Sequence, residues 1–179
     1  MHYNLYLQIS EADLLMVKEN LDAVEYDSEA IFYTSGYVVH HLTKIKSCKS
    51  CRLLLISNDD EESYHPFFTD INRSKLLYPS HLILHYTTML FGIFQIIKHR
   101  LIEKKHSPRS YILNFFQKMI IDDENLKVNC NDGHSFSVIL KMAAFSFINC
   151  ILKNHAKSFG KQNLCSSNSK KIKKLNSKH

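Results

Sequence analysis

Glycine and proline are scarce in this sequence. Its 179 residues include four Gly and three Pro, too few for a turn-rich β-sandwich or for a glycine-rich loop that binds phosphate groups. Hydrophobic residues make up 45% and charged residues 22% of the chain, which is typical of a globular domain. A domain of this length buries roughly 70% of its unfolded surface, so a core is expected without disulfides. We therefore expect helices to be the main elements.

Acidic residues are missing from the C-terminal end. Residues 156–179 contain seven Lys and no Asp or Glu, which leaves 16 Lys plus Arg against 17 Asp plus Glu in residues 1–155. The formal net charge of +6 therefore comes from the C-terminal end, and the body of the chain is close to neutral. We predict a helical domain over 1–159 and a disordered Lys-rich tail over 160–179.

The basic tail has two interpretations. It either contacts nucleic acid, DNA in particular, weakly, or only keeps the chain soluble. The lysines that would make the DNA contact are Lys170, Lys171, Lys173 and Lys174.

Secretion and membrane signals are also missing. The chain begins with polar Tyr3, Asn4 and Gln8 where a signal peptide has a basic segment and then an apolar one. The most apolar stretch, Leu82 to Leu101, is interrupted by polar side chains and falls short of a membrane span. We expect an intracellular protein, nuclear or cytoplasmic, without a membrane partner. Five Cys in such a protein indicate reduced thiols or metal ligands.

Apolar residues at spacings of three and four predict an all-α fold, an irregular bundle of about five helices. Residues 57–75 are predicted to form a loop, and residues 53–56 fit a helix or a short strand. The predicted helices start after Ser10, near Ser28, at Pro79 (running to about Lys105), at Ser107-Pro108, and at Ser135 (running to His155).

Two short Cys/His motifs carry the chemistry of this sequence. Cys48 and Cys51 form a C-x2-C pair, and Cys130 and His134 form a C-x3-H pair in which Gly133 allows a bend. Together they would make a closed Cys3His site for a structural Zn²⁺, because four protein ligands leave no position for water. The alternative is that these are unrelated thiols, since a C-x2-C pair is only half of a site. Cys150 is predicted to be a small buried hydrophobe and Cys165 a free thiol.

Catalytic arrangements are not apparent. The acidic runs Asp59 to Glu62 and Asp122 to Glu124 read as solvated turns, and most of the histidines as exposed or core residues. No nucleophile elbow or phosphate loop is found. We therefore predict that the chain is not an enzyme.

Four motifs occur in an order that resembles a known family. They are Tyr33-x-x-Gly36-Tyr37-Val38-Val39, Cys48-x-x-Cys51-x-Leu53, Leu76-Leu77-Tyr78-Pro79-Ser80 and Cys130-x-x-x-His134. This order resembles the C-terminal region of P-element-type transposases, the THAP-domain transposase family, over residues 28–160. Arg73-Ser74-Lys75 takes the place of a glycine-rich step often present there.

The resemblance implies an accessory role. Active enzymes of the family have an RNase H-like nuclease core with three carboxylates and Mg²⁺, a zinc-containing DNA-binding domain and a GTP-binding insertion, and their motifs have no counterpart in this sequence. The implied function is a catalytically inactive accessory region with a structural zinc site, whose partners are DNA, a second copy or the parent transposase. The alternative is a metal-free helical module for protein interaction or oligomerisation through Tyr78 to Leu101.

Overall fold

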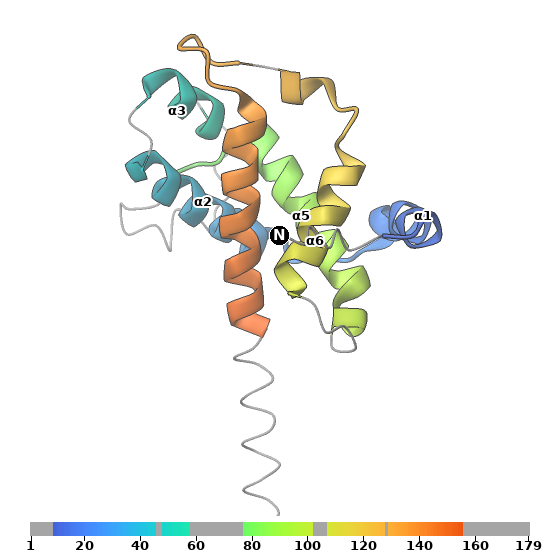
Figure 1. The fold of residues 1–179 in the computed structure, drawn as a ribbon. Coiled ribbons are helices and arrows are strands. Elements are labelled where there is room, and N and C mark those ends of the chain that lie inside the picture. The colour runs from blue at the N-terminus through green and yellow to red at the C-terminus, as the bar shows by residue number, and fades with distance from the viewer. Residues whose placement is uncertain (1–8, 46–47, 58–76, 102–106, 128, 156–179) are drawn as a thin grey trace, which may run out of the picture.

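The computed structural model describes residues 9–45, 48–57, 77–101, 107–127 and 129–155 (Figure 1). Of these residues 79% are helical and none lies in a strand longer than an isolated bridge, which confirms the all-α prediction. The predicted tail, most of the predicted loop 57–75 and Cys165 lie outside the described residues.

Helix α5, His81–Leu101, is the centre of the bundle. It contacts α1 (Glu11–Asn20), α2 (Ser28–Ile45), α3 (Lys49–Leu55), α6 (Pro108–Met119) and the 3-10 helix Leu21–Ala23. Apolar side chains occur around most of its circumference, as a helix surrounded by others requires. Its buried hydrophobic residues are Ile83, Tyr86, Leu90, Ile93, Phe94 and Ile97.

The final helix, Phe136–His155, runs beside α5 in the same direction. The ring of Tyr86 lies 6.2 Å from that of Phe136, and the ring of Phe94, further along α5, lies 5.3 Å from that of His155. On the other side, Phe116 of α6 lies 6.0 Å from Tyr86. These ring contacts join the three helices in one aromatic core. Figure 1 shows the course of the three helices.

Several predicted helix starts are confirmed. The Ser10 hydroxyl accepts the Asp13 backbone N–H at 3.1 Å and caps α1, and Pro108 occupies the first turn of α6. The final helix starts at Phe136, one residue after the predicted Ser135. The prediction for Pro79 is wrong, because it precedes α5. Its backbone pairs with Ile56, which leaves Ser80 to cap the helix through a 3.4 Å contact with the Ile83 N–H.

The spacing of apolar residues in the sequence predicts a broad apolar face for α2, made up of Ile31, Tyr33, Tyr37, Val38, Leu42 and Ile45. This prediction is only partly correct, because Tyr33 and Tyr37 are 39% and 51% exposed. The buried side of α2 includes Ser35, whose hydroxyl forms a 2.8 Å hydrogen bond with that of Thr87 in α5. The Ser35 hydroxyl lies 2.7 Å from the Ile31 carbonyl oxygen, and the Thr87 hydroxyl lies 2.9 Å from that of Ile83. Each buried hydroxyl therefore has an acceptor for its proton, so its burial is tolerated. The apolar members of this side are Ile31, Val38, Val39 and Leu42.

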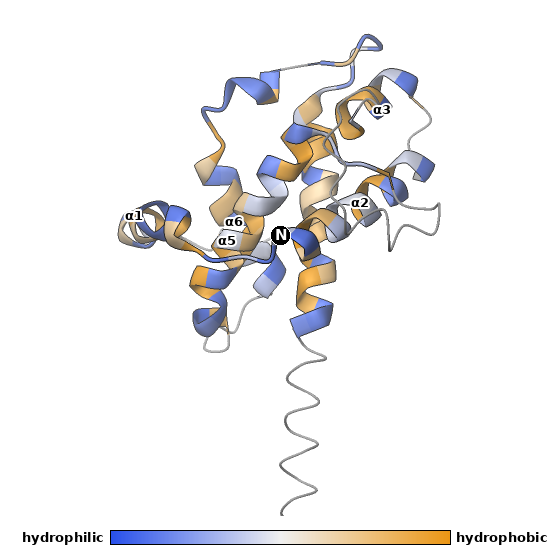
Figure 2. Ribbon diagram, turned by 180° about the vertical axis from the view of Figure 1, so that it is seen from behind, coloured by the Kyte–Doolittle hydropathy of each residue, from blue (hydrophilic) through white to orange (hydrophobic). Residues whose placement is uncertain are grey.

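One helix of the described residues is long and apolar enough to cross a membrane by length and composition, and it is Phe136–His155, not the segment Leu82 to Leu101 considered from the sequence. Its buried residues include Phe136, Leu140, Ala143 and Phe147, which belong to the hydrophobic core. Figure 2 shows its hydrophobic stretches beside those of α5, whereas the connection leading into it is hydrophilic. A core helix needs the same apolarity.

Helix α3 is joined to the beginning of α5 by backbone hydrogen bonds. The Ser57 N–H donates to the Tyr78 carbonyl at 3.1 Å, and the Ser80 N–H donates to the Leu55 carbonyl at 2.8 Å. The sequence leaves helix or strand open for residues 53–56. Residues 53–55 belong to α3, and Ile56 is extended and pairs with Pro79. These bonds place α3 at the end of the bundle where the final helix begins (Figure 1).

Candidate metal centre

The first pair of candidate ligands lies at the beginning of α3. Cys48 is the N-cap residue, and its sulfur accepts the Cys51 backbone N–H at 3.3 Å. A cap residue has extended backbone while the next residues are helical, so both sulfurs of a C-x2-C pair come to the same side of the first turn. Cys51 is buried and Cys48 is half-buried.

The second pair lies in a tight turn that precedes the final helix. The Cys130 N–H donates to the His134 carbonyl at 2.9 Å, and the Gly133 N–H donates to the Cys130 carbonyl at 2.8 Å. Gly133 has φ 77°, a left-handed conformation that costs glycine little and other residues more. This bend allows the sulfur of Cys130 and the ring of His134 to face the same point, as the sequence predicted.

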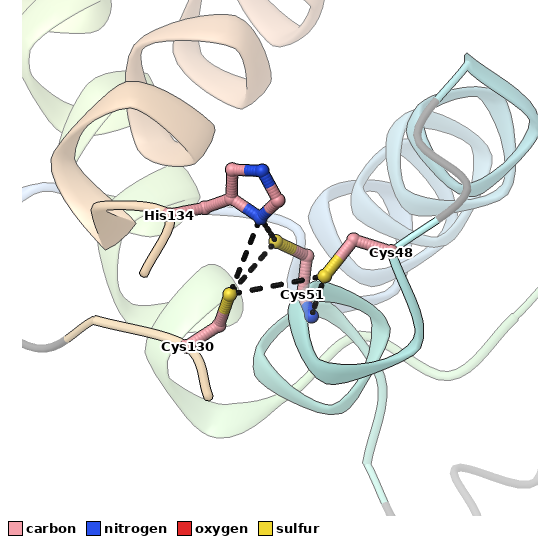
Figure 3. A group of neighbouring side chains, drawn as sticks. All are labelled: Cys48, Cys51, Cys130 and His134. Atoms are coloured by element: carbon pink, nitrogen blue, oxygen red, sulfur yellow. Dashed lines mark hydrogen bonds between the residues drawn. The ribbon is translucent and has the colours of Figure 1, made fainter. Parts of the chain in front are cut away.

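The two pairs meet, although they are about eighty residues apart in the sequence. The Cys130 sulfur lies 3.5 Å from that of Cys51 and 3.8 Å from that of Cys48, and the His134 Nδ1 lies 3.4 Å from the sulfurs of both Cys51 and Cys130. The four atoms lie within 4.8 Å of one another. Figure 3 shows the three sulfurs and Nδ1 turned toward a common centre.

These distances fit a tetrahedral ion. Ligands at the usual Zn–S and Zn–N bond lengths would be about 3.8 Å apart for two sulfurs and about 3.5 Å apart for sulfur and nitrogen. The described cysteines form no disulfide. Three cysteine sulfurs and one imidazole are a ligand set typical of structural Zn²⁺ sites. The residues could therefore hold a metal ion, and they fit Zn²⁺.

The protein environment makes the three thiols unequal. Burial, with hydrogen bonds to Cys48 and Cys130, raises the pKa of Cys51. Burial acts in the same direction on Cys130, but hydrogen bonds from the backbone of His134 and from Cys51 outweigh it and lower the pKa of Cys130 to about 7. Without a metal, the Cys130 thiol therefore loses its proton at a lower pH than the Cys51 thiol.

Asp132 is a neighbour of the cluster that sequence reasoning missed. Its Oδ2 lies 2.9 Å from the Cys48 sulfur, which donates its thiol proton to it. Hydrogen bonds from Cys48 and Ser50 lower the pKa of Asp132 and keep it ionised. Its position between Cys130 and His134 in the sequence was the available signal.

A second polar contact holds the chain segment that leads to Cys130. The hydroxyl of buried Tyr86 donates to Asp123 Oδ2 at 2.7 Å. Oδ1 of the same carboxylate accepts the backbone and side-chain N–H groups of Asn125, both at 2.9 Å. The run Asp122 to Glu124 was predicted to be a solvated turn, and Asp122 and Glu124 are exposed. The prediction is wrong for Asp123, which is half-buried and whose carboxylate joins the turn to α5.

Cys150 and the histidine pair His81 and His85, which the structure describes, lie outside the cluster. Cys150 is half-buried in the final helix, and burial raises the pKa of its thiol. His81 and His85, an i, i+4 pair of α5, are both exposed. Among the described residues, the group able to hold a metal ion consists of Cys48, Cys51, Cys130 and His134.

A comparison with protein families identifies the chain. The model of the C-terminal domain of DNA transposase THAP9 matches residues 21–161. The chain belongs to this family. The match confirms the resemblance to THAP-domain transposases and contains all four residues of the candidate metal centre. Neither a search of curated proteins nor a search of solved structures found a match to the chain.

Proposed function

We propose that this THAP9-type C-terminal domain binds one structural Zn²⁺ through Cys48, Cys51, Cys130 and His134. The observation that supports the proposal is the convergence of three sulfurs and one imidazole nitrogen within 4.8 Å. Four protein ligands form a closed site, so the ion would join α3 to the final helix and would not activate water.

The thiols must lose their protons when the ion binds, and the site is suited to this. The lowered pKa of Cys130 provides the first thiolate near neutral pH. The positive ion then favours the thiolate form of the other two cysteines, even though burial raises the pKa of Cys51. Zinc affinity should therefore increase with pH.

Metal analysis of the purified full chain tests the proposal. We expect about one zinc per chain in the natural sequence and a strongly reduced zinc content after Cys51→Ser, because only two sulfurs and one nitrogen remain and water must fill the fourth position. Cys150→Ser is the matched control, since Cys150 lies outside the cluster, and it should retain the zinc. Removing the ion with a chelator should lower the thermal midpoint and the helical circular dichroism signal. A natural chain that is fully folded without metal would contradict the proposal.

We further propose that the chain is a catalytically inactive accessory part of a transposase, located in the nucleus. The family match to the C-terminal domain of a DNA transposase supports this role. Nuclease assays of the purified chain with Mg²⁺ should show no cleavage of duplex DNA. Cleavage that Mg²⁺ supports would overturn it.

DNA contact is proposed for the basic tail. The logarithm of the DNA-binding constant falls linearly with the logarithm of the salt concentration, and each phosphate contact that is lost makes this slope less steep by about 0.9. Replacing Lys170, Lys171, Lys173 and Lys174 by Gln should therefore weaken binding to a short duplex and flatten its salt dependence. A Lys141→Gln variant provides a control on the folded domain, where Lys141 is exposed. Unchanged binding by the tail variant would exclude the tail.

A metal-free interaction module is the second candidate function. The segment Tyr78 to Leu101, predicted from the sequence as the interaction surface, is a poor candidate because α5 is the buried centre of the bundle. Exposed Ile121 instead borders an apolar groove of about 280 Å³ between α6 and the final helix. Sedimentation analysis separates the two candidates. A monomer with one zinc supports the first, and a metal-free oligomer that Ile121→Ser dissociates supports the second.

A further inference from the structure

The four candidate ligands differ in their surroundings. Cys51 and Cys130 are buried, Cys48 is half-buried and His134 is exposed. Among the three cysteines, Cys48 is the one whose sulfur contacts a carboxylate, at 2.9 Å from Asp132 Oδ2. The half-buried sulfur of Cys48 therefore has a second potential ligand beside it.

Metal binding to Cys48 would remove the hydrogen bond between Cys48 and Asp132. Without metal, the thiol donates a hydrogen bond to the carboxylate. A bound Cys48 would have lost this proton, which would leave two negative groups in contact with no hydrogen between them. The repulsion between the Cys48 thiolate and the Asp132 carboxylate would fall if the carboxylate rotated toward the positive ion.

We propose that Asp132 is a reserve ligand of the same ion, taking the position of Cys48 when that sulfur cannot bind. This inference rests on the proposed zinc site. Carboxylate oxygens bind Zn²⁺ at about 2.0–2.2 Å. Asp132 Oδ2 lies 2.9 Å from the Cys48 sulfur, next to the position that this sulfur would vacate, and the exposed side chain of Asp132 can turn toward the ion.

The exchange conserves the charge of the centre. Three thiolates and one neutral imidazole around Zn²⁺ have a net charge of −1, and replacing one thiolate by one carboxylate leaves it at −1. Asp132 is separated from Cys130 and from His134 by one residue each. The turn that supplies two of the ligands therefore also supplies the substitute, and α3 can lose Cys48 while Cys51 still binds.

The test measures Zn²⁺ affinity by chelator competition in the full chain and in four variants. These are Cys48→Ser, Asp132→Asn, the double variant Cys48→Ser/Asp132→Asn, and Cys51→Ser. Serine at position 48 keeps a side-chain acceptor for the first turn of α3. Circular dichroism of each variant with zinc checks that it folds, and the visible spectrum of bound Co²⁺ reports tetrahedral coordination and the loss of one sulfur.

A reserve ligand predicts effects that depend on the background. Asp132→Asn alone should change affinity less than ~10-fold, because Cys48 still binds. In the Cys48→Ser background the same replacement should lower affinity by more than ~10-fold. Cys51→Ser should bind zinc more weakly than Cys48→Ser, because Asp132 lies beside Cys48 and replaces that ligand alone. A carboxylate that only supports Cys48 from outside the site predicts the reverse order, with a loss of about 10–100-fold in the natural chain and no further loss after Cys48→Ser.

The possible outcomes separate the proposed zinc site from the proposed role of Asp132 as a reserve ligand. Equal affinities for Cys48→Ser and the double variant overturn the reserve ligand and leave the Cys3His site intact, as does a Cys48→Ser chain that binds no zinc while the natural chain binds one. A natural chain that binds no zinc overturns the metal site and the reserve ligand together.

Discussion

Replacing Tyr86 by Phe tests the polar contact that joins α5 to the turn leading toward Cys130. The ring of Tyr86 is fully buried and packs edge-on against Phe116, and phenylalanine can keep this packing. The variant therefore removes one hydroxyl, and with it the 2.7 Å hydrogen bond to Asp123.

The structure sets the size of the effect. A hydrogen bond to a charged group contributes about 1.5–3 kcal/mol. Asp123 is half-exposed and keeps both of its bonds from Asn125, so water can replace the missing donor and the lower end applies. We expect Tyr86→Phe to lower the free energy of unfolding by about 1.5 kcal/mol and the thermal midpoint by about 3–6 °C.

The same contact makes a specific contribution to the pH dependence. The hydrogen bond from Tyr86 is the main cause that lowers the pKa of Asp123 in the folded chain. A lowered folded-state pKa stabilises the fold above the unfolded value of about 3.9, and this contribution is lost as the pH falls through the folded value. The difference between the natural chain and Tyr86→Phe should therefore be largest near pH 7 and should shrink below pH 4.

Urea denaturation followed by circular dichroism measures both effects. Tyr26→Phe is the matched control, because Tyr26 is 51% exposed and its replacement should change stability by less than about 0.5 kcal/mol. A Tyr86→Phe chain as stable as this control at pH 7 would refute the claim that the contact holds the turn.

Two further substitutions test other contacts by urea denaturation. A Cβ at Gly92 would lie 2.5 Å from Leu21 Cδ1, the end of a flexible side chain that can move. The clash should therefore offset part of the roughly 1 kcal/mol that alanine gains over glycine in a helix, so Gly92→Ala should stabilise the chain by less than that amount. In a Leu21→Ala background the same change should give the full gain, and an equal effect in both backgrounds would exclude the clash. Asp13 pairs with Arg100, whose side chain is 43% exposed, so Asp13→Asn should cost less than about 1 kcal/mol. This cost should shrink in high salt, and a larger, salt-independent loss would contradict a surface ion pair.

Local signals in the sequence were sufficient to predict most helix starts. A cap is a contact between residues three apart, so Ser10 and Asp13 could be read directly, as could Pro108 in the first turn of α6. The facing of α2 was harder to predict. Its tyrosines are apolar enough to suit a buried stripe, but which side faces α5 depends on a neighbour that the sequence of α2 does not contain.

The candidate metal centre was predicted because its ligands come in two short motifs. Each pair is local, and the preference of zinc for sulfur and imidazole suggested how the pairs combine. Two contacts were missed, that of Asp132 with Cys48 and that of Tyr86 with Asp123, and both for one reason. They join residues 84 and 37 positions apart, and single Asp and Tyr residues are too common to indicate a partner.

The position of the cysteine cluster indicates what a bound ion would stabilise. Helix α3 has seven residues, too few to be stable alone in water. The bridge between Ile56 and Pro79 holds its C-terminal end, whereas the sulfurs of Cys48 and Cys51 face the turn at Cys130 from its N-terminal end. The aromatic core of α5, α6 and the final helix extends away from the cluster, as far as the contact between Phe94 and His155 at the end of the final helix. A metal would therefore act locally: it would fasten the beginning of α3 to the turn before the final helix, so chelation should loosen these two segments before the core of the bundle unfolds.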